Sequence, residues 1–350
     1  MPSHPDSRPL SPDRSIVDAH TFFFPEAWPD LDLKFGGPPW PWLRRTGPDT
    51  GTLMLGNQPF QPCTASLWDM ARRTADMDAQ SVGHQVLCAH PLLLLAERPP
   101  AQALFCAKVY NDAALKACEA DKARFTPLAQ VPLQDADLAC RELERALQGG
   151  HKGVQIANHV GGRDLDDPGL ITFLQHCDSL GAPVYVMPWS DLGGQRLRRH
   201  LLDWSIGLPA EIHLSIAAMI LGGAFEALPK SLRLCFASGG GAFPYMLGRL
   251  EQAWRRRDVA RGRAPRPPGA YLDRFCVDAD VGDARALRLL VDVMGPERIL
   301  LGSGYPSPLA EQPVGGLVRE AAFLDEAART AILQGNARAF LEPSARTVST

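Results

Sequence analysis

Residues that can transfer protons stand where several short apolar runs of this sequence end. The run that begins at Ile16 leads into Asp18 and His20, and a later run leads into Asp278 and Asp280. An imidazole titrates near neutral pH without any shift, so His20 suits a general acid or base. A carboxyl group buried at such a place has a raised pKa and can act as an acid. We therefore predict His20 and Asp280 as catalytic residues.

Each of these candidates also has a plainer interpretation. His20 can be a buried, hydrogen-bonded histidine, and Asp280 can cap the helix that follows it. His159, at the end of another run, can donate to a substrate carboxylate or have a structural role. Ser238 and His20 also form a candidate nucleophile–base pair, for which only the amides of Gly239–Gly241 would offer an anion site. We predict His159 and Ser238 as substrate-binding residues.

Eight short apolar runs predict the β-strands that would position these residues, and longer amphipathic stretches between them predict helices. The predicted strands are Ser15–His20, His84–His90, Thr126–Val131, Gly153–Ala157, Pro183–Met187, Leu232–Ala237, Arg274–Asp278 and Arg298–Gly302. The predicted helices are Ala101–Glu119, Asp135–Gln148, Gly169–Leu180, Glu211–Leu228, Pro244–Arg257 and Ala284–Met294.

This alternation predicts an α/β protein, a (β/α)8 TIM barrel with an insertion after the first strand. An open doubly wound sheet is the alternative, but no G-x-G-x-x-G motif follows any predicted strand. Catalytic residues of such barrels lie at the C-terminal ends of the strands. The candidate residues would therefore meet at one mouth.

A single barrel domain is predicted over residues 15–342, with a flexible leader at 1–14 and a tail at 343–350. Residues 25–75 interrupt the alternation, and their Gly- and Pro-rich stretch is incompatible with a helix interior. An insertion at this point lies on the face where barrels build active sites. Its tryptophans indicate a packed lid, and a hydrophobic cover without a ligand role is the alternative; they are Trp28, Trp40 and Trp42.

Composition argues against several classes of partner. The net charge of −3 gives no nucleic-acid footprint, and no apolar run approaches the roughly 20 residues of a membrane span. The N-terminal residues lack the apolar core of a signal peptide. The eight cysteines form no C-x-x-C pair, and several stand in apolar runs. We therefore expect a cytoplasmic protein with reduced cysteines and no nucleic-acid or membrane partner.

A series of short motifs, in a fixed order, resembles one known family. The motifs include Asp18-Ala19-His20, Leu67-Trp68-Asp69, Met77-Asp78-Ala79-Gln80, Pro188-Trp189, Gly239-Gly240-Gly241 and Gly302-Ser303. They extend from about residue 15 to 342. On these motifs the chain resembles the 2-amino-3-carboxymuconate-6-semialdehyde decarboxylases of the amidohydrolase superfamily.

The resemblance implies a TIM barrel, usually a homodimer, in which arginines bind the carboxylates of an unsaturated substrate and CO2 leaves. Arg249 occupies one of these arginine positions, which the family donates across the dimer interface. Gln61 stands at the other and carries no charge. Trp189 and Tyr305 belong to retained motifs. We predict all four as substrate-binding residues.

The resemblance also implies a zinc-bound hydroxide, and here the sequence departs from the family. His20 keeps one ligand position, but the remaining positions, which hold three His and one Asp in the family, are Phe22, Met187, Ser238 and Gly304. A catalytic zinc site needs three protein ligands, and a thioether is a poor partner in a hard site. We therefore predict no metal and no other cofactor.

Two hypotheses follow for the function. In the first, the protein is a metal-independent lyase or isomerase that decarboxylates, cyclises or tautomerises a small unsaturated carboxylate related to aminocarboxymuconate semialdehyde. His20 would move a proton and Arg249 would hold a carboxylate. In the second, it is a non-catalytic binding protein, or the dimer partner of an active paralogue. Both hypotheses have a small anionic metabolite as ligand, and a displaced metal is a third, weaker alternative.

Overall fold

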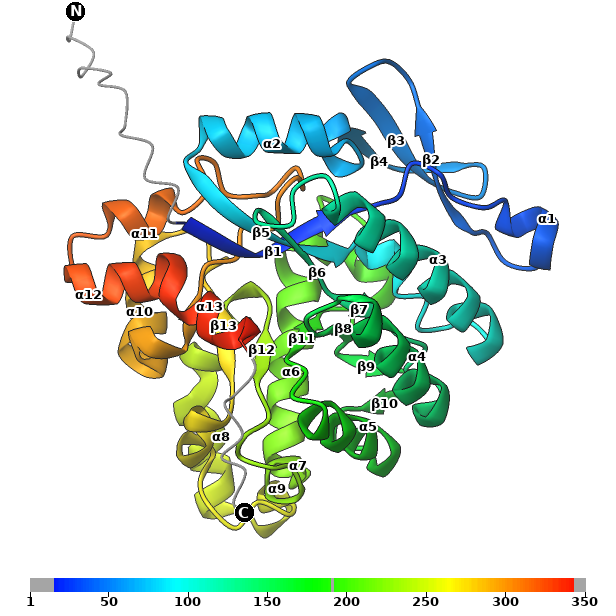
Figure 1. Cartoon of the computed structure of the whole chain (residues 1–350). Coiled ribbons are helices and arrows are strands. Elements are labelled where there is room, and N and C mark those ends of the chain that lie inside the picture. Colours follow the sequence, from blue (N-terminus) through cyan, green and yellow to red (C-terminus); the bar gives the residue numbers. More distant parts are fainter. Residues whose placement is uncertain (1–15, 190–191, 343–350) are drawn as a thin grey trace, which may run out of the picture.

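The structure is a computed structural model that describes residues 16–189 and 192–342. The predicted leader at 1–14 and tail at 343–350 lie outside the described residues. Parallel strands occupy the centre of the molecule and helices surround them (Figure 1). The predicted fold class, an α/β barrel, is confirmed.

Each of the eight predicted strands overlaps a strand of the structure, and the third is divided at Leu128 into two segments. The barrel strands are β1 (Ile16–Phe23), β5 (Val82–Ala89), β6 (Phe125–Pro127) with β7 (Ala129–Gln130), β8 (Val154–Ala157), β11 (Val184–Met187), β12 (Leu234–Phe236), β13 (Cys276–Asp278) and β14 (Ile299–Leu300).

These strands close into a ring. β1 pairs with β5 and β5 with β6, while β7, β8, β11, β12, β13 and β14 pair in that order. Between the first and last strands, the Ala19 N–H donates to the Leu301 carbonyl at 2.9 Å and the Phe22 N–H donates to the Tyr305 carbonyl at 2.7 Å. An open doubly wound sheet would leave two unpaired edges, so that alternative is wrong.

Helices follow the strands where amphipathic stretches predict them. The side chains of Asp135 and Asp167 accept hydrogen bonds from backbone N–H groups that a helix start leaves unpaired. The predicted helix Glu211–Leu228 is divided, because Gly223 has a φ of 77° that a helix interior does not allow. The helices are α2 (Met70–Ala79), α3 (Pro100–Cys118), α4 (Ala136–Gly149), α5 (Pro168–Ser179), α6 (Leu208–Leu221), α7 (Ala224–Ala227), α8 (Phe243–Arg256), α9 (Asp258–Arg261), α10 (Ala284–Met294), α11 (Gly316–Glu320), α12 (Glu326–Thr330) and α13 (Asn336–Leu341).

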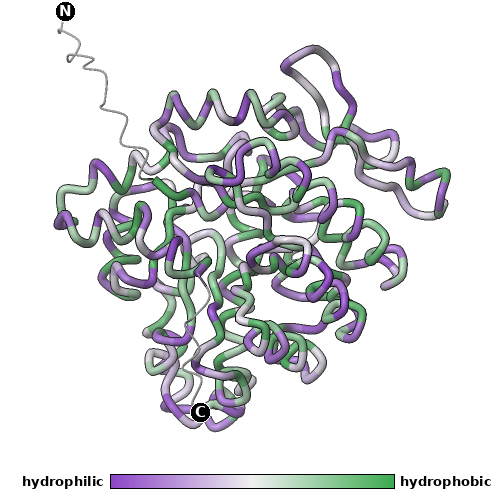
Figure 2. The backbone as a smooth tube through the Cα atoms, in the orientation of Figure 1, coloured by the Kyte–Doolittle hydropathy of each residue, from purple (hydrophilic) through white to green (hydrophobic). Residues whose placement is uncertain are grey.

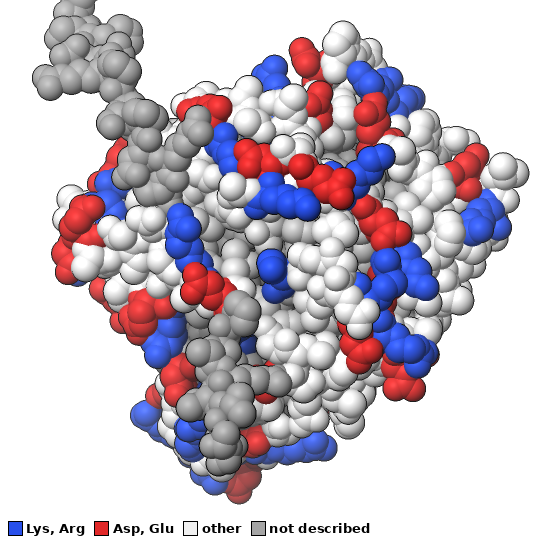
Figure 3. Space-filling view, viewed as in Figure 1, with Lys and Arg blue, Asp and Glu red and all other residues white. Residues whose placement is uncertain are grey.

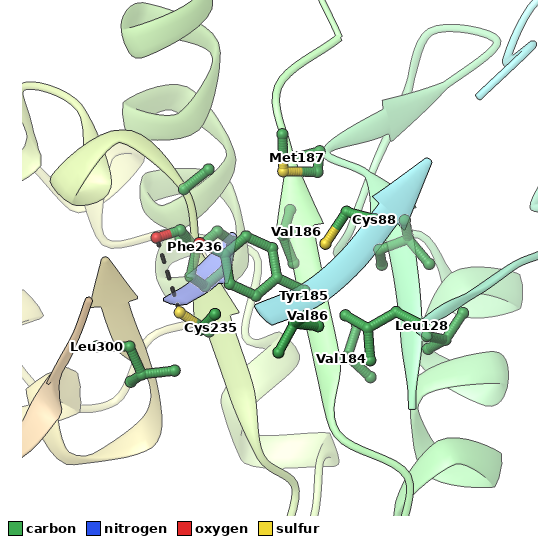
Figure 4. Packing of buried hydrophobic residues seen from close by; sticks show 14 of the residues in the cluster. Val86, Cys88, Leu128, Val184, Tyr185, Val186, Met187, Cys235, Phe236 and Leu300 are labelled. Atoms are coloured by element: carbon green, nitrogen blue, oxygen red, sulfur yellow. Dashed lines mark hydrogen bonds between the residues drawn. The ribbon is translucent and has the colours of Figure 1, made fainter. Parts of the chain in front are cut away.

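The core lies inside the barrel and between the barrel and its helices. Every residue of β1, β8 and β11 is buried, and the barrel strands are largely hydrophobic in Figure 2. Because side chains alternate along a strand, Val184 and Val186 face the helices while Tyr185 and Met187 face the barrel interior. Figure 4 shows part of this packing, in which the Cys235 thiol lies 4.0 Å from the Phe236 carbonyl.

The insertion after β1 folds as a small unit beside the barrel (Figure 1). Trp40 is 1% exposed and packs with Leu31, Leu95 and Cys106 in a second core, whereas Trp42 lies at the surface. The segment is therefore packed rather than loose. It consists of α1 (Leu31–Phe35) and an antiparallel sheet of β2 (Pro41–Arg45), β3 (Thr50–Leu55) and β4 (Gln58–Thr64).

The surface carries charges of both signs, interspersed over the face in Figure 3, in line with the net charge of −3. One stretch, Asp203–Leu221, is long and apolar enough to cross a membrane by length and composition alone. It contains α6, whose Ile212, Ile216 and Ile220 are fully buried in the core. Such burial is typical of a core helix in a globular protein.

Candidate active site

A cavity of about 460 Å³ opens at the C-terminal ends of the barrel strands, a size typical of small-molecule sites. Strands supply His20, Phe22 and Met187, and the short segments that follow β12, β13 and β14 supply Ser238, Asp280 and Gly304. The insertion supplies Leu55 and Phe60, two residues that line the cavity, in line with the lid interpretation. The rest of the wall is mostly apolar and includes Leu92, Trp189, Leu192, Leu197, Trp204 and Leu208.

His20 lies at the floor of this cavity and is 3% exposed. Its Nδ1 is 3.1 Å from Oδ2 of Asp278, while its Nε2 is buried and has no hydrogen-bond partner among the described residues. Burial lowers the pKa of His20, but the hydrogen bond to Asp278 and the negative charges of Asp278, Asp280 and Asp18 outweigh it and raise the pKa above its usual value. The ring is therefore oriented by a carboxylate and offers Nε2 to a ligand.

Asp278 is held in place from several sides. The Tyr185 hydroxyl donates to its Oδ2 at 2.6 Å, and the backbone N–H groups of Gly239 and Asp280 donate to its Oδ1 at 2.8 and 3.2 Å. A carboxylate surrounded by donors accepts from His20 as well, which places the Nδ1 hydrogen toward it. Sequence reasoning missed Tyr185; the signal was its position two residues before Met187, on the same strand face.

Asp280 stands beside Gly304 at the cavity floor. A Cβ atom placed on Gly304 would lie 3.9 Å from Oδ2 of Asp280, so the Asp280 carboxyl lies next to the position where the resemblance implies an Asp. Burial and the negative charge of Asp278 raise the pKa of Asp280 to about 7. The helix-cap interpretation does not hold, because Asp283 is the residue that caps α10.

Ser238 lines the cavity with a left-handed backbone, φ 55°, which is uncommon for a residue with a side chain. No hydrogen bond joins its hydroxyl to His20 within the described chain. The amides of Gly239, Gly240 and Gly241 already donate to Asp278, to the Ala237 carbonyl and to the Ser238 carbonyl. The anion site that a serine nucleophile would need is therefore missing at these glycines.

His159 and Trp189 have different roles from each other. Trp189 lines the cavity wall, as predicted, whereas His159 does not reach it. His159, in the short hairpin of β9 (His159–Val160) and β10 (Arg163–Asp164), has its Nε2 3.1 Å from the Trp189 carbonyl. Asn158 accepts from the Trp189 N–H at 2.7 Å. The pair Asn158 and His159 thus fixes both backbone groups of Trp189.

Three other predicted substrate-binding residues also lie away from the cavity. The Tyr305 hydroxyl donates to Asp76 of α2 at 2.6 Å, so it ties the barrel to a helix. Gln61 is buried in β4, and only its neighbour Phe60 reaches the cavity. Arg249 is exposed on α8, outside the cavity of its own chain. Register and helix rotation, which a sequence pattern does not give, decide these positions.

Two further cavity residues were not among the predicted binding residues. His90 lies directly after β5, and burial lowers its pKa to about 3, so it stays neutral and accepts from the Leu92 N–H. Arg198 lies in the segment after β11. The only sequence signal for Arg198 was its place on the C-terminal face of a predicted barrel.

The donors in the cavity do not fit a zinc ion. The five positions where the resemblance implies ligands all line it, and they hold His20, Phe22, Met187, Ser238 and Gly304. Only one of them is an imidazole, and its Nδ1 already contacts Asp278. Within residues 16–189 and 192–342, no group of three His, Cys, Asp or Glu side chains is arranged to hold a metal ion. Three protein ligands are the usual minimum for catalytic zinc.

Several known proteins are similar to this chain in sequence or in architecture. Residues 17–342 match the amidohydrolase family. The chain is 35% identical to the 2-amino-3-carboxymuconate-6-semialdehyde decarboxylase of Dictyostelium discoideum over 327 residues, 93% of this chain and 91% of that protein. The apo structure of Metarhizium anisopliae IDCase aligns with a TM-score of 0.81 at 21% identity, over 94% of this chain and 98% of that one. The 5-carboxyvanillate decarboxylase LigW from Sphingomonas paucimobilis aligns with a TM-score of 0.79 at 21% identity, over 95% and 100%.

These solved structures share the fold of this chain, and at 21% identity they show the fold alone. The chain belongs to the amidohydrolase family. Within that family it is similar to the 2-amino-3-carboxymuconate-6-semialdehyde decarboxylases. The resemblance predicted from the ordered motifs is therefore confirmed.

Proposed function

We propose that this protein is a metal-independent lyase that removes CO2 from a small unsaturated or aromatic carboxylate. The observation that carries the proposal is the setting of His20. Its Nδ1 is held by Asp278, and its Nε2, at the cavity floor, has no hydrogen-bond partner among the described residues. The similarity to decarboxylases supports the reaction class. The poor donor set for zinc supports independence from a metal.

The reaction begins with protonated His20. Its Nε2 gives a proton to the substrate carbon that bears the carboxylate, so a C–H bond forms and the unsaturated system becomes an electron sink. The bond to the carboxylate carbon then breaks, its electron pair returns to the unsaturated system, and CO2 leaves. One proton and one carboxylate are consumed, and His20 regains its proton from solvent. A positioned general acid of this kind contributes about 10²–10⁴-fold.

The neighbours of His20 support this step. Asp278 stabilises the imidazolium, and the Tyr185 hydroxyl fixes the Asp278 oxygen that faces His20. Asp280, whose pKa burial and Asp278 raise to about 7, carries a proton for much of the time at neutral pH. In that form it donates a hydrogen bond to a substrate carboxylate rather than repelling it.

The test measures CO2 release by chelator-treated protein whose metal content has been determined. The acids named for the similar decarboxylases, 2,6-dihydroxybenzoate and 5-carboxyvanillate, are the first substrates, followed by muconate-type acids. We expect turnover without metal and a loss of about 10²–10⁴-fold in His20→Asn. The control is His176→Asn, which lies on α5 and pairs with Glu144 outside the cavity. Activity that disappears on chelation and returns with zinc would contradict the proposal.

A second candidate function is a binding protein or a partner subunit without turnover. The exposure of Arg249 on α8, outside its own cavity, favours it. The test mixes a metal-bearing homologue with this chain and, separately, with the Arg249→Ala variant of this chain. A rise in the homologue's activity that depends on Arg249, together with no CO2 release by this chain alone, would favour the second candidate over the first.

We also propose that the protein is a homodimer in a reducing cytoplasm. The family resemblance supports the dimer, and light scattering of the purified protein tests it. The eight cysteines are free in the described structure, and burial raises the pKa of Cys63 and Cys276 to about 11. Unreactive thiols of this kind suit a reducing compartment.

A further inference from the structure

The cavity has a cation at its rim that neither the motifs nor the mechanism above uses. Among the described residues that line the cavity, Arg198 is the only Lys or Arg. It is exposed, whereas His20 and Met187 are 3% and 2% exposed. The cavity therefore has an acid–base group at the buried floor, apolar walls and a positive charge at the open end.

Arg198 has no counter-ion in the described part of the chain. No Asp or Glu described in the structure forms an ion pair with its guanidinium, and no side-chain hydrogen bond reaches it there; Asp203 lines the same cavity without pairing to it. Arg199 and Arg249 are exposed and also have no ion pair among the described residues, so it is the place beside this cavity that distinguishes Arg198. A guanidinium without a partner beside an apolar cavity suits a planar anion such as a carboxylate.

The backbone next to Arg198 is held in an unusual conformation. His200 and Leu201 both have left-handed backbones, with φ of 60° and 54°, which costs about 1–2 kcal/mol per residue. Leu201 is 61% exposed, so burial of its side chain does not offset this cost. Backbone strain of this kind is concentrated at ligand clamps and switch regions, which fits a binding role for this rim.

The positions expected to supply positive charge do not supply it within this chain. Gln61 is uncharged and lies away from the cavity, and Arg249 is exposed on α8. Apart from protonated His20 at the buried end, a negatively charged ligand in this cavity has Arg198 as its one described cationic partner from the same chain. Within the described residues of this chain, the Lys or Arg charge at the cavity comes from the segment after β11.

We infer that Arg198 binds a carboxylate of the ligand, and that the ligand is an elongated aromatic or unsaturated acid. Its flat apolar body lies against Phe22, Phe60, Met187 and Trp189, its remote carboxylate reaches Arg198, and its other end meets His20. This inference rests on the proposed function for the identity of the site, and it names the ligand class and a residue that determines specificity.

The experiment is a calorimetric titration with terephthalate, a rigid aromatic dicarboxylate, and with its uncharged analogue terephthalamide. We expect terephthalate to bind the wild type and to bind Arg198→Gln at least tenfold more weakly, while Arg198→Lys keeps part of the affinity. The matched control is Arg199→Gln, since Arg199 is also exposed but does not line the cavity; its affinity is expected within twofold of the wild type.

Further outcomes decide the question. Added salt should weaken terephthalate binding to the wild type more than to Arg198→Gln. Equal affinity of wild type and Arg198→Gln, no binding of terephthalate to the wild type, or terephthalamide binding as tightly as terephthalate would each overturn the inference. If terephthalate binds through Arg198 while no acid loses CO2, the proposed lyase activity fails and this inference stands. If His20→Asn abolishes CO2 release while Arg198→Gln binds terephthalate normally, the proposed lyase activity stands and this inference fails.

Discussion

At the scale of single residues, Asp280 and Gly304 together keep one carboxyl group at the cavity floor. The position where the resemblance implies an Asp is Gly304 here, and Asp280 lies beside it in the cavity. The Asp280 Oδ2 lies 3.9 Å from the place of a Gly304 Cβ. The carboxyl group therefore comes from the strand end next to the expected one, and it faces His20 rather than a ligand set for zinc.

Asp280→Asn should stabilise the protein at high pH only. The pKa of Asp280 is raised from 3.8 to about 7 by burial and by Asp278, so the folded protein binds this proton more tightly than the unfolded chain. Its contribution to stability is complete below about pH 4 and is lost as the pH rises toward 7. We expect Asp280→Asn to be more stable than the wild type at pH 8 by on the order of a few kcal/mol, and nearly equal at pH 4. Urea unfolding at both pH values measures this, and a gain of the same size at both would contradict it.

Gly302→Ala should disrupt the His20–Asp278 pair. A Cβ on Gly302 would lie 2.8 Å from the Cβ of His20 and 2.9 Å from the Cβ of Asp278, and both atoms belong to barrel strands with little room to shift. We expect a loss of about 1–3 kcal/mol in urea unfolding. The control is Gly248→Ala in α8, which meets no atom within 4 Å and should be neutral or stabilising. Equal behaviour of the two variants would show that the barrel adjusts without cost.

At the scale of elements, one buried network connects β8, α6 and the segment that carries Trp189. Asn158 follows β8, and its Nδ2 donates to the Glu211 carbonyl at 3.2 Å and to Glu211 Oε2 at 3.1 Å. Glu211 Oε1 in turn accepts from the Leu192 N–H at 2.7 Å. The cavity wall at Trp189 therefore depends on polar groups that do not themselves touch a ligand.

Asn158→Ala should loosen that wall. The substitution leaves the Trp189 N–H without its buried acceptor, and losses of this kind cost about 1–3 kcal/mol. We expect lower stability in urea and stronger acrylamide quenching of tryptophan fluorescence, since Trp189 becomes more accessible. The same substitution in a Trp189→Phe background should leave the quenching of the remaining tryptophans unchanged. A change in that background would assign the effect to general loosening of the fold.

At the scale of the whole molecule, the barrel is intact while its expected metal ligands are replaced. The chain closes the ring of strands, buries a continuous core and brings all five expected ligand positions into one cavity. Barrel stability comes from apolar burial spread over many residues, whereas a metal site depends on a few donors at the mouth. Loss of the donors therefore leaves the fold unchanged.

Restoring those donors should restore metal binding. We expect the combined variant Phe22→His, Met187→His, Ser238→His, Gly304→Asp and Asp280→Leu to purify with stoichiometric zinc, and the wild type to purify with far less. Elemental analysis measures both, and Phe22→His alone serves as the control because two imidazoles do not make a zinc site. Zinc at full stoichiometry in the wild type, or a folded combined variant that binds none, would contradict the expectation.

The sequence by itself determined the strands, the long helices, the barrel class and the family. These features are local or ordered along the chain: alternation fixes which strand face is buried, and the end of a strand fixes where its next side chain lies. For that reason His20, Asp280, Ser238 and Trp189 were expected at the mouth, and they lie there.

The tertiary structure alone decided which of these side chains meet. His20 contacts Asp278 across a separation of 258 residues, Tyr305 turns to Asp76, and Arg198 reaches the cavity from an irregular segment. Such contacts depend on the stagger of neighbouring strands around the ring and on helix rotation, to which a pattern of apolar and polar residues is insensitive. Residues distant in sequence become partners only when the closed barrel sets their relative heights.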